Sequence, residues 1–205
     1  MAFISIRSVI PHPGKDALVV ERARTLGEIY NRYGARTRVA RVAAGDGAGQ
    51  IYLAVAVDNG KTLAAAYDRV QADPAFAKLL QEREQNHGGT MTGPEVYRTV
   101  HGQVQPGHSV VLMREYAVAR DKLESILALM PELDTLVQAH DVKVLASLPV
   151  FSADMERMIA AYYFRSAAHL GDAMDGVGQS AEFQTIVTRA AAFGRLVRSR
   201  VVVNI

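Results

Sequence analysis

The strongest constraint on the fold of this chain is an internal repeat with an offset of 107 residues. The stretch "IYLAVAVDNGKTLAAAYDRVQADPAFAKLLQER" at 51–83 aligns without a gap with "MIAAYYFRSAAHLGDAMDGVGQSAEFQTIVTRA" at 158–190. Six positions are identical, and the hydrophobic pattern and the helix breaks also coincide. A chain of 205 residues therefore divides into two similar halves, each long enough to bury a core of its own.

The repeat includes the start of a helix in each half, at "QADPAF" (71–76) and "GQSAEF" (178–183). Asp73 and Ser180 are residues of the type that caps a helix N-terminus, and Pro74 suits the first helical position. Phe76 and Phe183 then begin the apolar face of the helix. We expect a broken second helix in each half, interrupted immediately before these caps.

Each half is predicted to contain the same six elements in the order βαββαβ. We expect both first helices to bend, at Gly27 and Pro131, and Asp121 with Glu124 to form a capping box. In the N-terminal half the predicted strands span 3–9, 37–44, 50–57 and 95–100, with helices at 15–33 and at 61–72 plus 74–86. In the C-terminal half the strands span 110–116, 142–148, 157–165 and 195–203, with helices at 121–139 and at 167–177 plus 181–192.

This order predicts an α+β protein made of two tandem ferredoxin-like units, residues 1–104 and 105–205. Each unit has a four-stranded antiparallel sheet with both helices on one face. The strand at 50–57 is apolar on both faces, so the other sheet face must be covered too. The economical arrangement packs the two sheets against each other, with the helices outside and 101–109 as the connector.

The element order and the "DPAF" and "SAEF" helix starts resemble the dimeric α/β-barrel superfamily. That superfamily includes antibiotic-biosynthesis monooxygenases, haem-degrading monooxygenases and the NIPSNAP family. Most members form the barrel from two chains, so the resemblance implies that a tandem duplication forms a pseudo-dimeric α/β barrel within this one chain.

The resemblance also allows a test of haem chemistry. The haem-degrading members place Trp six residues before this Phe and a haem-ligating His four residues after it. Here Val70 and Val177 occupy the first position, Leu80 and Val187 occupy the second, and the chain has no Trp. We therefore expect no cofactor.

Arg7 and Arg114 are the most informative candidates for ligand binding, because each lies in an apolar strand. One interpretation is a strand-end arginine that reaches solvent or pairs with an acid such as Glu115, since an unpaired buried guanidinium is costly. The other is an anion or carbonyl anchor in a cavity, because arginine presents planar, bidentate donors.

Tyr52, Tyr162 and Tyr163 lie on predicted central strands. Such tyrosines are commonly core aromatics whose hydroxyl bonds to the backbone. Alternatively, a hydroxyl that faces a cavity orients an aromatic substrate or donates to an oxyanion.

Composition and charge narrow the functional classes. A net charge of +2 and clustered arginines without interleaved aromatic residues argue against nucleic-acid binding. Without cysteine there is no thiolate site, and the six histidines have no metal-like spacing. The N-terminus lacks the pattern of a signal peptide and no apolar run could span a membrane, so a cytoplasmic protein without membrane contact is expected.

Two functional hypotheses follow from the sequence. The first is a protein that binds a small apolar or aromatic compound in cavities between sheet and helices, one per half. The resemblance implies that such a protein, if it is an enzyme, is a cofactor-independent monooxygenase. The second is a non-catalytic scaffold that forms a homo-oligomer through its sheet edges. No catalytic residue can be named from the sequence.

Overall fold

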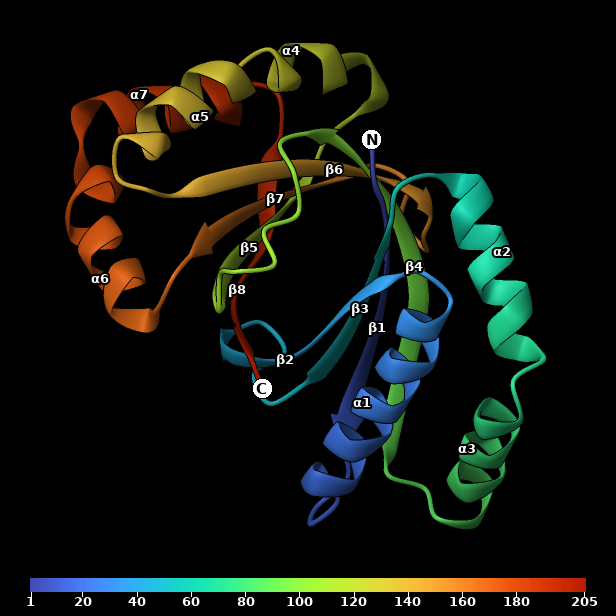
Figure 1. Ribbon diagram of the computed structural model, residues 1–205. Coiled ribbons are helices and arrows are strands. Elements are labelled where there is room, and N and C mark those ends of the chain that lie inside the picture. The colour runs from blue at the N-terminus through green and yellow to red at the C-terminus, as the bar shows by residue number, and fades with distance from the viewer.

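The computed structural model describes residues 1–205, and its eight strands close into one antiparallel barrel (Figure 1). Around the barrel the strand order is β1-β3-β2-β8-β5-β7-β6-β4. Each half contributes four neighbouring strands, and the halves meet at the β2–β8 and β4–β6 pairs. The strands are β1 (Phe3–Pro11), β2 (Arg36–Gly45), β3 (Ile51–Val57), β4 (Gly89–His101), β5 (Val110–Ala117), β6 (Lys143–Phe151), β7 (Arg157–Phe164) and β8 (Arg195–Asn204).

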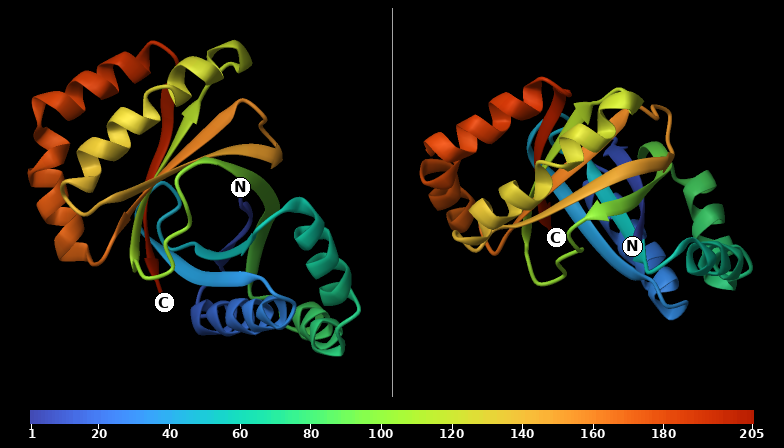
Figure 2. Two further views of the ribbon diagram at one scale, coloured as in Figure 1. Left: turned by 45° about the horizontal axis from the view of Figure 1, so that its top comes forward. Right: turned by 90° about the horizontal axis from the view of Figure 1, so that it is seen from above.

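The helices lie outside the barrel in two groups, each against the strands of its own half (Figure 2). The N-terminal group is α1 (Asp16–Arg32), α2 (Gly60–Gln71) and α3 (Pro74–Gln85). The C-terminal group is α4 (Leu123–Leu127), α5 (Met130–Gln138), α6 (Ala167–Asp175) and α7 (Ala181–Ala191). The predicted order βαββαβ, the α+β class and the pseudo-dimeric barrel are confirmed. No helix is both long and apolar enough to cross a membrane.

The two predicted helix caps are confirmed. The Asp73 carboxylate accepts a hydrogen bond from the Ala75 N–H at 2.8 Å, and the Ser180 hydroxyl accepts one from the Phe183 N–H at 3.2 Å. Both satisfy a backbone donor that the first helical turn leaves without a partner. These caps fix where α3 and α7 begin.

Three local predictions concern the first helix of each half, and one of them, the capping box, is wrong. Helix α1 runs unbroken through Gly27. This glycine lets the helix lie close to the sheet, since an added Cβ would be 3.0 Å from the Thr37 hydroxyl oxygen. In the C-terminal half the expected disturbance near Pro131 takes the form of an interruption at Ala128 and Leu129, and Pro131 lies in the first turn of α5. The turn at 120–122 shows no side-chain cap, so the expected capping box does not form.

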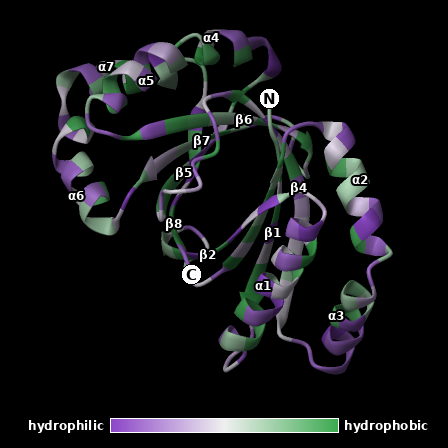
Figure 3. Cartoon of the chain, in the orientation of Figure 1, coloured by the Kyte–Doolittle hydropathy of each residue, from purple (hydrophilic) through white to green (hydrophobic).

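Alternate residues of each strand face the barrel interior and the helices. On β3, Leu53, Val55 and Val57 belong to the core beneath the N-terminal helices, while Tyr52 belongs to the core inside the barrel. The strands are accordingly largely apolar, whereas the helices alternate between apolar and polar residues (Figure 3). Burial on both faces of β3 explains why this strand has no polar face.

Closure of the barrel removes the free sheet edges. Every strand is hydrogen-bonded to a neighbour on both sides. The self-association through sheet edges that the scaffold hypothesis assumes therefore has no free edge to use.

Candidate functional site

The larger sheet–helix cavity lies in the C-terminal half, between the outward face of β5 and β7 and helices α4 to α7. Its volume is about 450 Å³, within the usual range for a small-molecule site. It is predominantly apolar, and no aspartate, glutamate, lysine or histidine lines it. Its polar lining side chains are Arg114, Tyr116, Tyr162, Gln179 and Gln184.

Arg114 is the only charged residue of this cavity. It makes no salt bridge, its buried Nε has no hydrogen-bond partner, and the groups that interact with its guanidinium are the neutral phenols of Tyr116 and Tyr162. The suggested pairing with Glu115 is wrong, since strand alternation turns Glu115 into the barrel, where it accepts a hydrogen bond from Arg200 at 2.7 Å. An arginine in an apolar setting without a counter-ion is costly unless another group compensates it.

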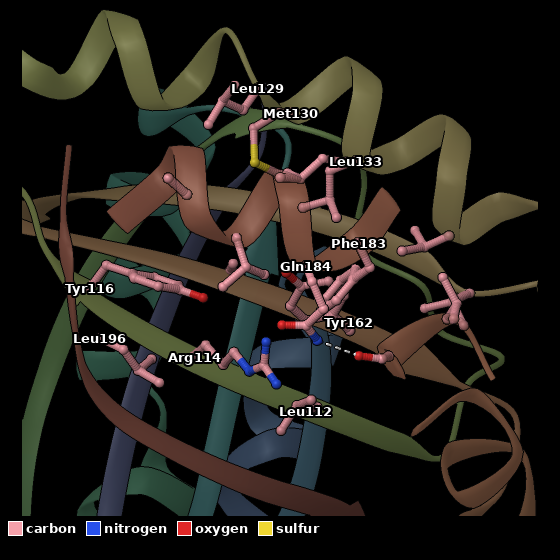
Figure 4. A pocket seen from close by; sticks show the side chains of 18 of the residues that line it. Leu112, Arg114, Tyr116, Leu129, Met130, Leu133, Tyr162, Phe183, Gln184 and Leu196 are labelled. Carbon is pink, nitrogen blue, oxygen red and sulfur yellow. Dashed lines mark hydrogen bonds between the residues drawn. The ribbon is translucent and has the colours of Figure 1, made fainter. Parts of the chain in front are cut away.

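Two phenols lie beside this guanidinium. The Arg114 Cζ lies 5.7 Å from the centre of the Tyr162 ring, and the Tyr116 hydroxyl points into the same space (Figure 4). Burial raises the pKa of both Tyr116 and Tyr162, and the neighbouring Arg114 opposes that rise. Both phenols therefore keep their protons at neutral pH and can donate a hydrogen bond.

Helix α7 brings a carboxamide to the opposite wall. The Gln184 Nε2 donates to the Gly178 carbonyl at 2.7 Å, which ties α7 to the turn before it (Figure 4). Gln184 adjoins Phe183, whose place in the repeat predicted the apolar face of α7. The cavity thus has a cation and two phenols on the sheet side, and a carboxamide among apolar helix residues opposite.

A second cavity of about 330 Å³ occupies the equivalent place in the N-terminal half. Arg7 lines it, and its guanidinium donates to the Tyr30 hydroxyl at 3.4 Å. Arg22 and Arg83 line it as well, over an apolar floor that includes Leu53 and Phe76. No acidic residue lines it.

Tyr52 and Tyr163 lie elsewhere, inside the barrel. They line a space of only about 80 Å³, which is below the usual range for a small-molecule site. Each ring has an arginine Cζ 5.8 Å from its centre, from Arg200 and Arg38 respectively. The five sequence candidates therefore separate into three places: Arg7 in one cavity, Arg114 and Tyr162 in the other, and Tyr52 and Tyr163 inside the barrel.

The cavities do not suit a histidine-ligated haem. Leu80 and Val187, at the position that the resemblance assigns to the haem ligand, line the N-terminal and C-terminal cavities. Apolar side chains cannot ligate iron, and no histidine lines either cavity. No group of three or more His, Cys, Asp or Glu side chains gathers elsewhere to hold a metal.

The fold is shared with solved structures over almost the whole chain. A candidate monooxygenase from Lactobacillus acidophilus superposes with a TM-score of 0.65 at 8% identity, covering 99% of this chain and 93% of that one. One from Fusobacterium nucleatum gives 0.66 at 6% identity, covering 99% and 94%. An anthrone oxidase-like protein gives 0.65 at 12% identity, covering 100% and 91%.

The chain has the dimeric α/β-barrel fold. No protein-family model matches the sequence, and no curated protein is similar to it in sequence. At such low identities the likeness concerns the fold alone, so the chemistry must come from the residues of the cavities.

Sequence reasoning missed Tyr116, Arg22 and Arg83. Tyr116 could have been predicted from the sequence, because it lies two residues after Arg114 on the same strand and therefore on the same strand face. Arg22 lies on α1 three residues after the buried Val19, among the residues that face the sheet. Arg83 had no signal, since exposed helical arginines are common.

Proposed function

We propose that this protein binds a small, apolar, aromatic compound with one anionic or strongly accepting oxygen, in the cavity of the C-terminal half. The observation that carries the proposal is the unpaired Arg114 guanidinium in an otherwise uncharged cavity. A ligand anion would supply the counter-charge that the protein does not provide. Tyr116 and Tyr162 would donate to the same oxygen, and the apolar helix residues would contact the body of the ligand.

An oxygenation reaction is the activity that we propose for this site. The anthrone oxidase-like structural neighbour suggests the class of substrate to test first. In such a reaction an anthrone loses a proton, its anion reacts with O₂, and the products are an anthraquinone and water. Arg114, Tyr116 and Tyr162 would stabilise the negative charge on the substrate oxygen.

The cavity limits which substrates could react. Its lining includes no carboxylate and no histidine, so it lacks the usual side chains that accept a proton. We therefore propose that Arg114 stabilises the enolate of the substrate while its proton passes to water, and expect neutral analogues that cannot form such an anion to bind weakly.

We further propose that residues 1–104 and 105–205 arose by tandem duplication. The support is that residues 107 positions apart line equivalent places in the two cavities. Leu26 and Leu133, and Phe76 and Phe183, are such pairs. The scaffold hypothesis does not account for two cavities at equivalent places.

Calorimetric titration with 2-naphthoate tests the binding proposal. The wild type should bind it more tightly than 2-naphthylmethanol, which has no charge. Arg114→Met should weaken naphthoate binding about 10- to 150-fold, because a hydrogen bond to a charged group contributes about 1.5–3 kcal/mol. Arg195→Met, at an exposed position outside the cavity, is the matched control. Equal binding by Arg114→Met and the control would overturn the proposal.

Oxygen uptake with anthrone tests the activity separately. We expect uptake by the wild type above the rate without protein, and a loss of that excess in Arg114→Met. If naphthoate binds but no excess uptake occurs, the protein is a binder and the oxygenase proposal is wrong.

A further inference from the structure

The cavity of the N-terminal half differs in charge from its counterpart. Three arginines line it: Arg7 on β1, Arg22 on α1 and Arg83 on α3. None of them makes a salt bridge, and no acidic residue lines the cavity. Three cations therefore share one apolar space without an anion from the protein.

The contacts of these arginines leave donors free. Arg22 gives its two terminal nitrogens to the Asn86 and Glu82 carbonyls, at 2.7 and 2.8 Å, while its buried Nε has no partner. Arg7 makes only the 3.4 Å contact with Tyr30, and Arg83 only a 3.9 Å contact with the Met91 sulfur. A guanidinium has five N–H donors, so most of the donors of Arg7 and Arg83 remain available.

The repeat shows that this charge is specific to one half. Arg7 corresponds to Arg114, but Arg22 corresponds to Leu129 and Arg83 to Ala190, and all six residues line the cavity of their own half. Two positions that are apolar in one cavity are thus cationic in the other. The two cavities therefore favour ligands of different charge.

We propose that the N-terminal cavity is a second binding site, which takes a phosphate monoester of an apolar alcohol or phenol. The phosphate would lie among the three guanidinium groups, with planar paired donors from Arg7 and Arg83 and the free Nε–H of Arg22. Its apolar part would lie on Leu26, Leu53 and Phe76. This site is independent of the Arg114 site and does not rest on its function.

Calorimetric titration with 2-naphthyl phosphate tests the proposal, with 2-naphthoate, 2-naphthol and inorganic phosphate as comparison ligands. The Arg114→Met protein is used throughout, so that binding of the anionic ligands to Arg114 in the C-terminal cavity does not add to the measured signal. Naphthyl phosphate should bind at least tenfold more tightly than naphthol or inorganic phosphate. Binding should also tighten from pH 5 to pH 8, because a phosphate monoester gains its second negative charge near pH 6.

Two further substitutions give this cavity the residues of its counterpart. Arg22→Leu with Arg83→Ala should weaken naphthyl phosphate binding more than tenfold and reduce its preference over naphthoate. Arg83→Ala alone, at an exposed position, serves if the double variant does not fold. Arg69→Ala, exposed on α2 outside the cavity, is the matched control and should bind like the parent.

The proposal is overturned if naphthyl phosphate binds no better than naphthol, or if Arg83→Ala and Arg69→Ala weaken binding equally. A failure of the naphthoate test on Arg114 would leave these results unaffected. The two proposals are thus tested separately.

Discussion

At the scale of single residues, the neighbours of a charged side chain decide whether it is neutralised within the protein or free to bind a ligand. Arg200 on β8 has the carboxylates of Glu115 and Asp46 as partners, together with Tyr52, whereas Arg114 on β5 has no acidic partner. Asp73 is a third case, since it caps α3 and also accepts hydrogen bonds from Arg32 at 2.7 Å and Tyr33 at 2.9 Å. Partners, rather than burial alone, separate structural charges from those available to a ligand.

The hydrogen bonds to Asp73 predict a pH-dependent stability. Those from Arg32, the Ala75 N–H and Tyr33 lower the pKa of Asp73 from 3.8 to about 2. A lowered pKa means that the folded state favours the ionised form, so this contribution is complete above pH 4 and is lost as the pH falls toward 2. Asp73→Asn should therefore lower the free energy of unfolding at pH 7, and the difference from the wild type should shrink below pH 4.

Urea denaturation at pH 7, 4 and 2.5 measures this difference. Asp68→Asn, on an exposed position of α2, is the control, since Asp68 makes no ion pair. A difference between Asp73→Asn and the wild type that stays constant with pH would contradict the assigned role.

At the scale of elements, the helix starts carried the most reliable sequence information. The caps at Asp73 and Ser180 were predictable because a cap depends on a few neighbouring residues. The effect of Gly27 was not, because it depends on Thr37 and Leu53, which only the fold brings near. The break near Pro131 was expected as a bend, since a proline marks a disturbance but does not determine its extent.

The cap on α7 predicts a measurable loss of stability. Ser180→Ala removes the acceptor for the Phe183 N–H and should lower the free energy of unfolding by about 1 kcal/mol. Thr185→Ala, one turn into the same helix, is the matched control, because its hydroxyl donates only to the Ala181 carbonyl and alanine has the higher helix propensity. Equal losses in both variants would show that the cap contributes nothing.

At the scale of the whole molecule, the two halves are held together by strand pairing at two seams and by a buried ionic cluster. Arg200 on β8 contacts Glu115 of its own half and Asp46 and Tyr52 of the other, beside the β2–β8 seam. Alternation along β3 predicted that Tyr52 and Leu53 lie on opposite faces of the strand, and they do. The arginine partner of Tyr52, 148 residues later, could not be predicted without the barrel.

Removal of Arg200 should destabilise the barrel strongly. Arg200→Met leaves Glu115 largely buried and without its nearest cation, which should cost about 3–5 kcal/mol. Arg200→Met combined with Glu115→Leu should recover much of that loss, because it removes the remaining charge as well. Chemical denaturation of the two variants distinguishes these outcomes, and an equal or greater loss in the double variant would contradict a charge effect.

The central claim concerns the cavity of the C-terminal half and its single unpaired cation. A crystal structure of the protein with 2-naphthoate tests that claim most directly. We predict that the carboxylate lies within hydrogen-bond distance of the Arg114 guanidinium, with the rings between β5, β7 and the helices. Naphthoate bound only elsewhere at saturating concentration, with this cavity empty, would contradict the account.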